Sequence, residues 1–370
     1  MRMIIPNKKY KIALIGYRLS DGGAEKVMAV LSFFFEKQGI EVHTIIVLDA
    51  VSYSYAGKLV NLGKMKNKTN GFSNKFSRFL FLKNYLKEHE FDFIIDFRFR
   101  IKPIQELLIS KWLYKTNTIF TVHSYLINHY MPNWSVLTRY MYGNCYKVVS
   151  VSNQSKELIA RKHQLKNAIT IYNPIDIEEI VRKSEEPVSL NFKYIIGIGQ
   201  METNIKQFDK LIEAYAHSTL PQKGIHLVLL GEGKRKNILL KLVKEKKLGD
   251  KVHFLGFKQN PFKYLKNAKF FVLSSLNEGL PNVLLESLAC NTPVISFDCL
   301  AGPSEIIVNK ENGLLVENQN GSKMTEAMNL FIEDEVLYQH CKQNALASVQ
   351  SFSIENIGMQ WLDVMKISRK

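Results

Sequence analysis

Short apolar runs recur along the chain and are separated by segments with helical apolar spacing. Residues 24–38 and 208–217 are two such segments, and both are predicted to be helices. Apolar runs without alternation are typical of parallel strands that are covered on both faces. The pattern therefore predicts an α/β fold with two successive series of strand, loop and helix. The predicted strands are residues 11–16, 41–48, 91–96, 117–122, 147–152, 194–199, 226–230, 252–256, 270–273 and 293–297.

The stretch from residue 270 to residue 303 carries the clearest functional signal. Its pattern predicts a strand at 270–273, a loop at 276–281, a helix at 282–290 and a second strand at 293–297. In such units, ligands bind where the loops leave the carboxyl ends of the strands. The free N–H groups at the start of the helix favour an anion. A nucleotide diphosphate fits that position.

Two carboxylates frame this unit, because Glu278 lies in the loop and Glu286 lies about one turn into the helix. A carboxylate can accept hydrogen bonds from two adjacent hydroxyls, as a ribose or a sugar ring offers them. The alternative is that both are solvated acids on a loop and on a polar helix face. Spacing alone does not decide between these interpretations.

Two further features lie in the first half of the chain. Gly22 and Gly23 precede a predicted helix, where glycine lets the backbone approach a ligand closely, although a simple tight turn explains them equally well. His123 follows the predicted strand 117–122, where its ring can donate a hydrogen bond to a sugar or phosphate oxygen. A lone His is more often structural.

The length of the chain and an Asn-Pro pair near its middle predict two domains. A chain of 370 residues is long enough for two domains of about 150–200 residues, each with its own core. An Asn-Pro pair at 173–174 precedes a charged, weakly periodic segment, residues 177–191, that reads as a connector. We therefore place the boundary at residue 176, which gives a first domain of residues 1–176 and a second of residues 177–351.

Charge is unevenly distributed, since residues 1–150 hold 22 Lys and Arg against 10 Asp and Glu, within a total net charge of +16. This excess predicts a surface for an anionic partner. Residues 58–87 combine Lys, Arg, Phe and Leu and can form an amphipathic helix on anionic lipid, or their apolar side can be ordinary core. No nucleic-acid partner is expected, because no binding motif accompanies the charge.

Other classes of protein are disfavoured by composition. The four cysteines are scattered without a CxxC pair, which argues against a zinc site and a disulfide scaffold, and Cys299 is best read as a small filler. No apolar run reaches the roughly 18 residues of a membrane span. The first ten residues have too little apolar length for a secretory signal, so we expect a cytoplasmic protein.

The sequence EGLPNVLLE, from Glu278 to Glu286, resembles the E-x7-E motif of retaining GT-B glycosyltransferases of family four. The following FDCLAGPSEII, residues 297–307, resembles the next segment in bacterial members that build surface polysaccharides. This resemblance implies a GT-B fold, in which two Rossmann-like domains face each other across a cleft and the last segment, residues 352–370, crosses back onto the first domain. It also implies sugar transfer from a nucleotide diphosphate with retention of the anomeric configuration, without a metal ion or a cofactor.

The resemblance also assigns roles in the second domain. Glu278 is expected to contact the hydroxyls of the donor sugar and Glu286 the ribose. Lys206 matches the family's diphosphate-binding Lys, whereas Gln200 stands where an Arg is usual and Gln207 where a Gly is usual. Lys234 or Arg235 can compensate for the missing cation. Backbone N–H groups around Gly279 to Asn282, a loop that also contains Leu280 and Pro281, would meet the sugar and phosphates.

In the first domain, DGGAEKV, residues 21–27, resembles the glycine loop that faces the donor phosphates and the acceptor, which assigns Gly22 and Gly23 to the donor site. The run TVHS, residues 121–124, places His123 where the family has a cleft His. Its implied role is to hold the donor sugar and to stabilise an oxocarbenium-like transition state. Lys206, Glu278 and His123 are therefore the predicted catalytic residues.

The resulting hypothesis is a metal-independent hexosyltransferase. It would move a hexose or N-acetylhexosamine from a UDP-linked donor to a glycan acceptor linked to polyprenyl diphosphate, as in the synthesis of lipopolysaccharide or capsule. The protein would sit peripherally on the anionic inner face of the cytoplasmic membrane. The alternatives are a nucleotide-sugar epimerase or hydrolase of the same fold, and a non-catalytic basic protein that binds lipid or nucleic acid, which Gln200 favours.

Overall fold

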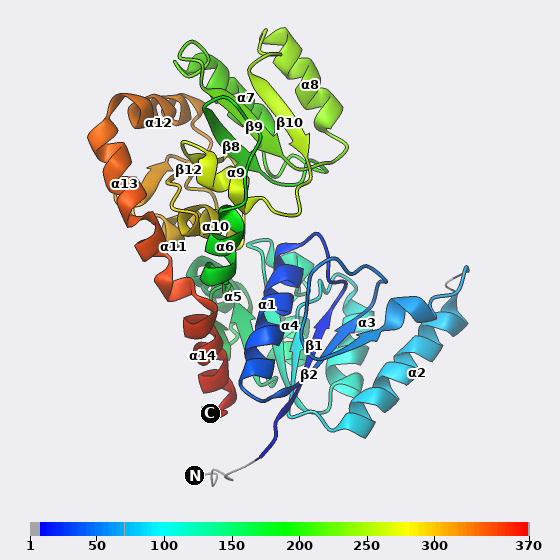
Figure 1. The fold of residues 1–370 in the computed structure, drawn as a ribbon. Coiled ribbons are helices and arrows are strands. Elements are labelled where there is room, and N and C mark those ends of the chain that lie inside the picture. Colours follow the sequence, from blue (N-terminus) through cyan, green and yellow to red (C-terminus); the bar gives the residue numbers. More distant parts are fainter. Residues whose placement is uncertain (1–7, 70, 369–370) are drawn as a thin grey trace. The chain divides into compact units, whose positions relative to one another are not determined.

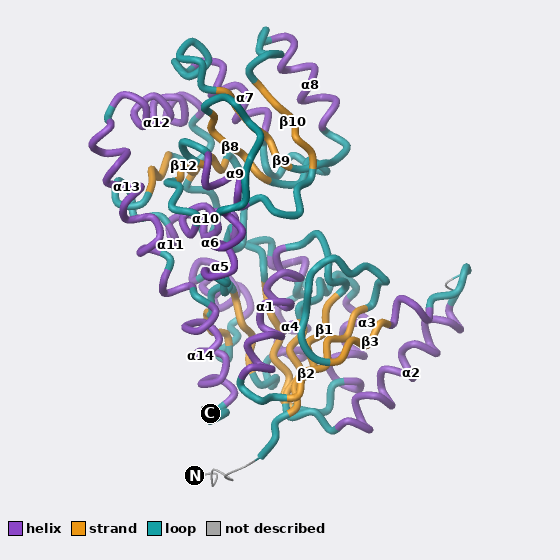
Figure 2. Tube along the Cα trace, viewed as in Figure 1, coloured by secondary structure: helices purple, strands orange, loops and turns teal. Residues whose placement is uncertain are grey.

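The computed structural model describes residues 8–69 and 71–368. It divides into two compact units, with Met1–Pro174 and Ile354–Lys370 in unit 1 and Ile175–Ser353 in unit 2 (Figure 1). Residues 1–7, part of the segment for which the sequence predicts no secretory signal, lie outside the described residues. Each unit is built around one parallel sheet, drawn in orange in Figure 2.

The sheet of unit 1 has seven parallel strands in the order β3-β2-β1-β4-β5-β6-β7. Its strands are β1 (Lys11–Gly16), β2 (Glu41–Ile46), β3 (Lys58–Asn61), β4 (Phe93–Asp96), β5 (Asn117–Val122), β6 (Lys147–Ser150) and β7 (Ala168–Thr170). Its helical segments are α1 (Gly23–Lys37), η1 (Leu62–Met65), α2 (Phe72–His89), α3 (Pro103–Leu108), the π turn η2 (Ile109–Leu113), η3 (Ile127–His129), α4 (Ser135–Tyr142), α5 (Asn153–His163) and α14 (Ile354–Met365).

Alternate residues of these strands point into two separate hydrophobic cores, one on each face of the sheet. Helices α1 and α14 pack on one face of the sheet, and α2, η2, α4 and α5 pack on the other. Close packing fixes α14 on α1, because a Cβ atom on Gly358 would lie 2.6 Å from the ring of Phe34. The hydroxyl of Tyr146 also donates a hydrogen bond to the carbonyl oxygen of Val364 at 2.8 Å. The last helix is therefore an integral part of unit 1.

The sheet of unit 2 has six parallel strands in the order β10-β9-β8-β11-β12-β13. Its strands are β8 (Tyr194–Ile198), β9 (His226–Leu230), β10 (Val252–Gly256), β11 (Phe271–Leu273), β12 (Val294–Phe297) and β13 (Gly313–Val316). Its helical segments are α6 (Ile177–Ser184), α7 (Phe208–His217), α8 (Lys236–Glu245), α9 (Phe262–Asn267), α10 (Asn282–Ala289), α11 (Pro303–Ile306), α12 (Gly321–Glu333), α13 (Glu335–Ser348) and η4 (Gln350–Phe352).

Two predicted segments differ in the structure. The predicted connector, residues 177–191, begins with helix α6. The side chain of Asp176 caps this helix by accepting a hydrogen bond from the N–H of Glu179 at 2.8 Å, and Ile180 is buried. The region therefore has helical structure that its charge conceals.

The predicted amphipathic helix at 58–87 is wrong over its first part. Residues 58–61 form strand β3, and the side chain of Asn61 then caps the 3-10 turn η1. The helix α2 begins only at Phe72. Part of its apolar side is ordinary core, because Leu82, Tyr85 and Leu86 are buried. Phe72 and Phe76 are exposed instead, as they would be on a helix that meets lipid.

Candidate functional site

The order of strands in unit 2 reverses between β8 and β11. The chain moves outward from β8 through β9 to β10 and then returns to β11 on the other side of β8. In open α/β sheets, ligands bind outside the carboxyl ends of the strands at such a reversal. The two loops that meet there are residues 199–207, between β8 and α7, and residues 274–281, between β11 and α10. The predicted donor residues of unit 2 other than Glu286 lie in these loops or at the first residue of α10.

An ion pair joins the two loops. The Nζ atom of Lys206 lies 2.6 Å from Oε1 of Glu278, and their side chains are 24% and 12% exposed. The loops are also tied through backbone oxygens, because the Ser274 hydroxyl donates to the carbonyl of Lys206 and the N–H of Leu276 donates to that of Ile205, both at 2.8 Å. The structure therefore brings together a cation and a carboxylate that are far apart in the sequence, although their catalytic roles remain predictions.

The loop before α10 is held by close backbone packing. Gly302 has φ of +101°, and a Cβ atom there would lie 2.5 Å from Cδ of Pro281. The N–H of Glu278 donates to the carbonyl of Leu300 at 3.2 Å. Pro281, the residue before α10, makes no side-chain cap to this helix, whose first residue is Asn282. The positive end of the helix dipole lies at this loop and favours an anion there.

Glu286, the other acid of the E-x7-E motif, lies in the second turn of α10 and is only 7% exposed. Its burial makes a freely solvated surface acid the weaker of the two sequence interpretations. Contact with a ribose remains a prediction.

The backbone of the next loop supports the loop that carries Gln200. A Cβ atom on Gly231, whose φ is +136°, would lie 1.9 Å from the carbonyl oxygen of Gly199. The N–H of Met201 donates to the carbonyl of Glu232 at 2.7 Å. The two loops therefore touch through their main chains, and Gln200, which is exposed, occupies the usual Arg position beside them.

Of the two cations that the sequence offers as compensation, Arg235 is the better placed. Its guanidinium lies 3.7 Å from the carboxylate of Asp209 in the first turn of α7, and its side chain is 28% exposed. Lys234 points into solvent, being 88% exposed, and lies 3.6 Å from Glu202. Arg235 therefore lies close to the start of the helix that Lys206 precedes.

The backbone conformation at Gln207 is one that suits a Gly. Its φ of +44° is left-handed, a conformation in which glycine has no steric penalty. Its side-chain amide exchanges two hydrogen bonds with that of Gln319, at 2.9 and 2.8 Å. This pair fixes the end of the Lys206 loop, and no sequence signal pointed to Gln319.

In unit 1, the two glycines lie at the start of α1, with Gly22 as the residue before the helix and Gly23 as its first residue. A Cβ atom on Gly22 would lie 1.9 Å from Oε2 of Glu25. The carboxylate of Glu25 thus folds back over the start of its own helix, and burial raises its pKa. A side chain at this position would therefore displace the carboxylate of Glu25, whether or not a ligand also binds.

His123 directly follows β5. Both ring nitrogens are buried, and neither makes a hydrogen bond that meets standard geometry with another described residue. Burial and the charge of Arg100 lower the pKa of His123 to about 3, an effect that the amide of Asn173 partly opposes. The imidazole is therefore neutral at neutral pH and can donate one hydrogen bond and accept one.

A buried ionic network at the carboxyl end of β4 was missed by the sequence analysis. The guanidinium of Arg98 lies 2.7 Å from Asp96 and 3.0 Å from Glu106. Burial raises the pKa of Glu106, which the charge of Arg98 opposes. Arg100 is 1% exposed and donates to the backbone carbonyls of Asp96, Arg98, Thr121 and Tyr130. The run DFRFR at the end of a predicted strand was the available signal.

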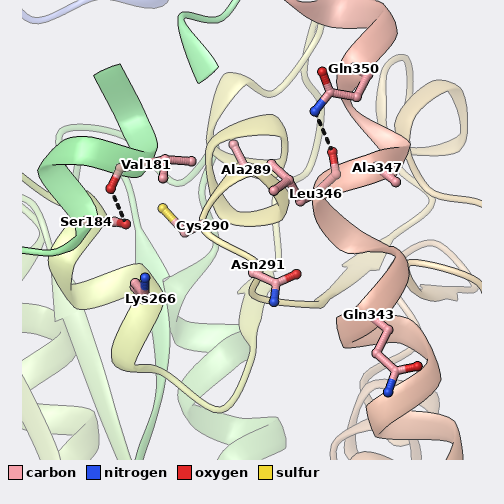
Figure 3. A pocket seen from close by; sticks show the side chains of 10 residues that line it. All are labelled: Val181, Ser184, Lys266, Ala289, Cys290, Asn291, Gln343, Leu346, Ala347 and Gln350. Carbon is pink, nitrogen blue, oxygen red and sulfur yellow. Dashed lines mark hydrogen bonds between the residues drawn. The ribbon is translucent and has the colours of Figure 1, made fainter. Parts of the chain in front are cut away.

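A pocket of about 610 Å³ lies at the carboxyl end of α10 (Figure 3). It is lined by α6, α9, the end of α10 and α13, including Val181, Ser184, Lys266, Cys290, Asn291 and Leu346. An eight-residue helix is about 12 Å long, so this pocket and the donor loop lie at opposite ends of α10. The pocket is therefore separate from the predicted nucleotide site.

Comparison with known proteins agrees with the architecture. The family model described as "Glycosyl transferases group 1" matches residues 176–347. The model described as "Glycosyltransferase Family 4" matches residues 21–179. Together the two models span most of both units.

Two relatives come from Campylobacter jejuni. The chain is 31% identical to the N-acetylgalactosamine-N,N'-diacetylbacillosaminyl-diphospho-undecaprenol 4-alpha-N-acetylgalactosaminyltransferase, over 92% of this chain and 95% of the relative. It is 28% identical to the GalNAc-alpha-(1->4)-GalNAc-alpha-(1->3)-diNAcBac-PP-undecaprenol alpha-1,4-N-acetyl-D-galactosaminyltransferase, over 96% and 98% of the two chains.

The fold is also similar to that of solved glycosyltransferases. HepE of Anabaena, in complex with UDP and glucose, superposes with a TM-score of 0.78 at 17% identity, over 96% of this chain and 99% of HepE. TarM superposes with a TM-score of 0.78 at 16% identity, over 98% and 100% of the two chains. The chain belongs to the family-four glycosyltransferases, and its two Rossmann-like domains are those of the GT-B fold.

Proposed function

We propose that this glycosyltransferase retains the anomeric configuration and transfers a hexose or N-acetylhexosamine from a UDP-linked donor. The observation that carries the proposal is the Lys206–Glu278 pair at the strand reversal of unit 2. A donor offers a partner to each member of this pair. The diphosphate suits the ammonium group, and the hydroxyls of the sugar suit the carboxylate.

The acceptor in this proposal is a glycan linked to polyprenyl diphosphate, at the cytoplasmic face of a membrane. Both Campylobacter relatives are named for undecaprenol-linked substrates and for transfer of N-acetylgalactosamine. UDP is favoured as the nucleotide because HepE, which shares the fold, binds UDP and glucose. Surface polysaccharide assembly, as in lipopolysaccharide or capsule, is the corresponding biological role.

The chemistry proposed is a front-face substitution that needs no metal ion or other cofactor. The acceptor oxygen forms a bond to the anomeric carbon while the bond from that carbon to the diphosphate oxygen breaks. The proton of the acceptor hydroxyl passes to the departing diphosphate. Lys206 and the N–H groups at the start of α10 stabilise the charge that develops on this leaving group. His123, neutral at neutral pH, supplies a hydrogen bond rather than a positive charge to the donor sugar.

A transfer assay with UDP-, GDP- and ADP-linked sugars and a polyprenyl-diphosphate glycan tests this proposal, with nuclear magnetic resonance reading the product's anomeric configuration. Glu286→Ala is expected mainly to weaken donor binding, and His123→Ala mainly to lower turnover. Glu333→Ala, an exposed acid on α12, is the matched control. An inverted product would refute retention, and loss of activity with a chelator that added metal restores would refute metal independence.

Nucleotide binding distinguishes the main alternative. If none of the three nucleotide diphosphates binds, Gln200 marks a disabled site, and the transferase proposal fails. If UDP-sugar is consumed without an acceptor, the protein is an epimerase or a hydrolase.

A further inference from the structure

The outer side of α3, η2 and α4 in unit 1 is unusually apolar. Five side chains on it are between 62% and 79% exposed: Ile104, Trp112, Trp134, Val136 and Tyr140. We call these five residues the α3–α4 surface. Helix α3 runs directly into η2, and η2 contacts α4, so these side chains lie on neighbouring elements. Exposed apolar patches mark sites of interaction with proteins, ligands or membranes.

The exposure follows from how the two helices pack. Ile109 and Leu113 of η2 face the core of the sheet. Ile104 and Trp112, which are eight residues apart and so lie on one side of the helical path, therefore face outward. On α4, Met141 and Tyr142 are buried in the same core. Both helices are thus apolar on the outside as well as the inside, where a solvated helix would carry polar residues.

Basic groups border these apolar side chains, and the one acid of α3, Glu106, is buried against Arg98. Residues 107–156 contain no Asp or Glu. The ammonium group of Lys111 lies over the ring of Tyr140, 4.6 Å from its centroid, and so connects η2 to α4. The ammonium group of Lys162 donates to the side chain of Asn133, beside Trp134, at 3.0 Å. The surface therefore combines aromatic rings with positively charged side chains.

The surface begins at the edge of the sheet that carries the candidate site of unit 1. Helix α3 follows the carboxyl end of β4, and α4 follows the carboxyl end of β5, where His123 lies. A bilayer touching these two helices would thus be close to the loop that follows β5. This placement is what an acceptor held by a lipid in the membrane requires.

We propose that the α3–α4 surface binds the anionic headgroup and interfacial region of a lipid bilayer. Trp and Tyr rings favour the membrane interface, and Lys and Arg favour anionic lipid. Among the described residues, no helix is long and apolar enough to cross a membrane. The inference deepens the proposed function and rests on its lipid-linked acceptor, but its test needs neither donor nor acceptor.

The chain carries its own probes for this test. Two of its three tryptophans, Trp112 and Trp134, belong to the surface, and the third, Trp361, is buried in the core of unit 1. The experiment titrates the full chain with vesicles of equal parts phosphatidylglycerol and phosphatidylcholine, some with brominated acyl chains. We expect the tryptophan emission to shift to the blue and to be quenched by the bromine. In a Trp112→Phe, Trp134→Phe double variant, the emission of Trp361 should be unaffected.

Binding is then measured by cosedimentation with the same vesicles. Trp112→Ser and Trp134→Ser should each weaken binding about tenfold, as expected for removal of one large apolar contact. Lys111→Gln should weaken it about fivefold, and vesicles of phosphatidylcholine alone should bind less. Phe257→Ser, which changes a 62% exposed aromatic residue in unit 2, is the matched control and should bind normally. Circular dichroism and the melting temperature show whether each variant is folded.

Three results would overturn the proposal. The first is wild-type emission that brominated vesicles do not quench. The second is loss of binding in Phe72→Ser, on the exposed end of α2, with normal binding in the tryptophan variants. The third is concentration-dependent self-association that buries these tryptophans in the absence of lipid. Transfer to a soluble short-chain acceptor analogue should survive in all the surface variants, so a failure of this inference is distinguishable from a failure of the proposed function.

Discussion

Neutralising the carboxylate of Glu278 should tighten the binding of UDP while reducing sugar transfer. In the described structure, Glu278 accepts a hydrogen bond from Lys206 at 2.6 Å, so it competes with a diphosphate for the same ammonium group. Glu278→Gln keeps the size of the side chain and a hydrogen-bond acceptor but removes the charge. The diphosphate then faces a less strongly held Lys206 and no nearby carboxylate charge.

The magnitude follows from the strength of the bond that is weakened. A hydrogen bond to a charged group contributes about 1.5–3 kcal/mol, and one between neutral groups about 1 kcal/mol. The competition relieved in Glu278→Gln is therefore about 1 kcal/mol, or about fivefold in Kd. Solvent reaches both side chains, which are 24% and 12% exposed, so a larger electrostatic gain is not expected. Lys206→Met removes the cation itself and should weaken UDP binding about tenfold to a hundredfold.

Titration calorimetry of UDP against the wild type, the two single variants and the double variant measures these effects. The opposite signs of the two single changes are the decisive feature, because general damage to the loops would weaken binding in both. If Glu278→Gln weakens UDP binding as much as Lys206→Met does, Glu278 positions Lys206 instead of competing for it. Glu333→Gln, on the surface of α12, controls for the loss of one negative charge.

Three further predictions concern other parts of the molecule. The pKa of His123 is lowered from its ordinary value of 6.5 to about 3, so between these values only the unfolded chain binds a proton on this residue. The melting temperature of the wild type should therefore fall as the pH drops below 6.5, and it should fall less steeply in His123→Gln. Arg100→Met removes the guanidinium that donates to four backbone carbonyls, and should lower the free energy of unfolding by about 3–5 kcal/mol, as denaturant titration would show. Gly302→Ala should cost about 1–3 kcal/mol of stability and also weaken UDP binding, because its Cβ atom would collide with Pro281; an unchanged UDP affinity would show that this loop does not form the site.

The strands were the most predictable part of the fold, and the reason is their burial. Strands β8 and β11 are covered on both faces, so their sequences are continuous apolar runs with clear ends. Helix α6 was missed because one buried apolar residue, Ile180, and a capping Asp176 are its main signals within a charged segment. Strand β3 has only four residues and an exposed end, so its composition resembled that of the helix after it.

The candidate site was predictable as a set of loops but not as a set of contacts. The motif from Glu278 to Glu286 is local, so the sequence places both residues on one loop and helix. The pairing of Glu278 with Lys206 depends on β11 lying beside β8, a relation that spans 72 positions and arises from the order of strands. The Gln207 and Gln319 amide pair has the same origin, because its partners lie 112 positions apart.

The ion pair between Lys206 and Glu278 would also distinguish a nucleotide sugar from UDP, the product that remains after sugar transfer. A diphosphate that takes the ammonium group of Lys206 leaves Glu278, which is only 12% exposed, without its partner, and an unpaired, poorly solvated carboxylate is costly. A nucleotide sugar removes this cost, because its hydroxyls replace the ammonium group as donors to Glu278, whereas UDP alone does not. The same pair that holds the donor in place would therefore favour release of UDP once the sugar has left. In Glu278→Gln the discrimination between UDP-sugar and UDP should consequently shrink, because the neutral amide loses less when it has no partner.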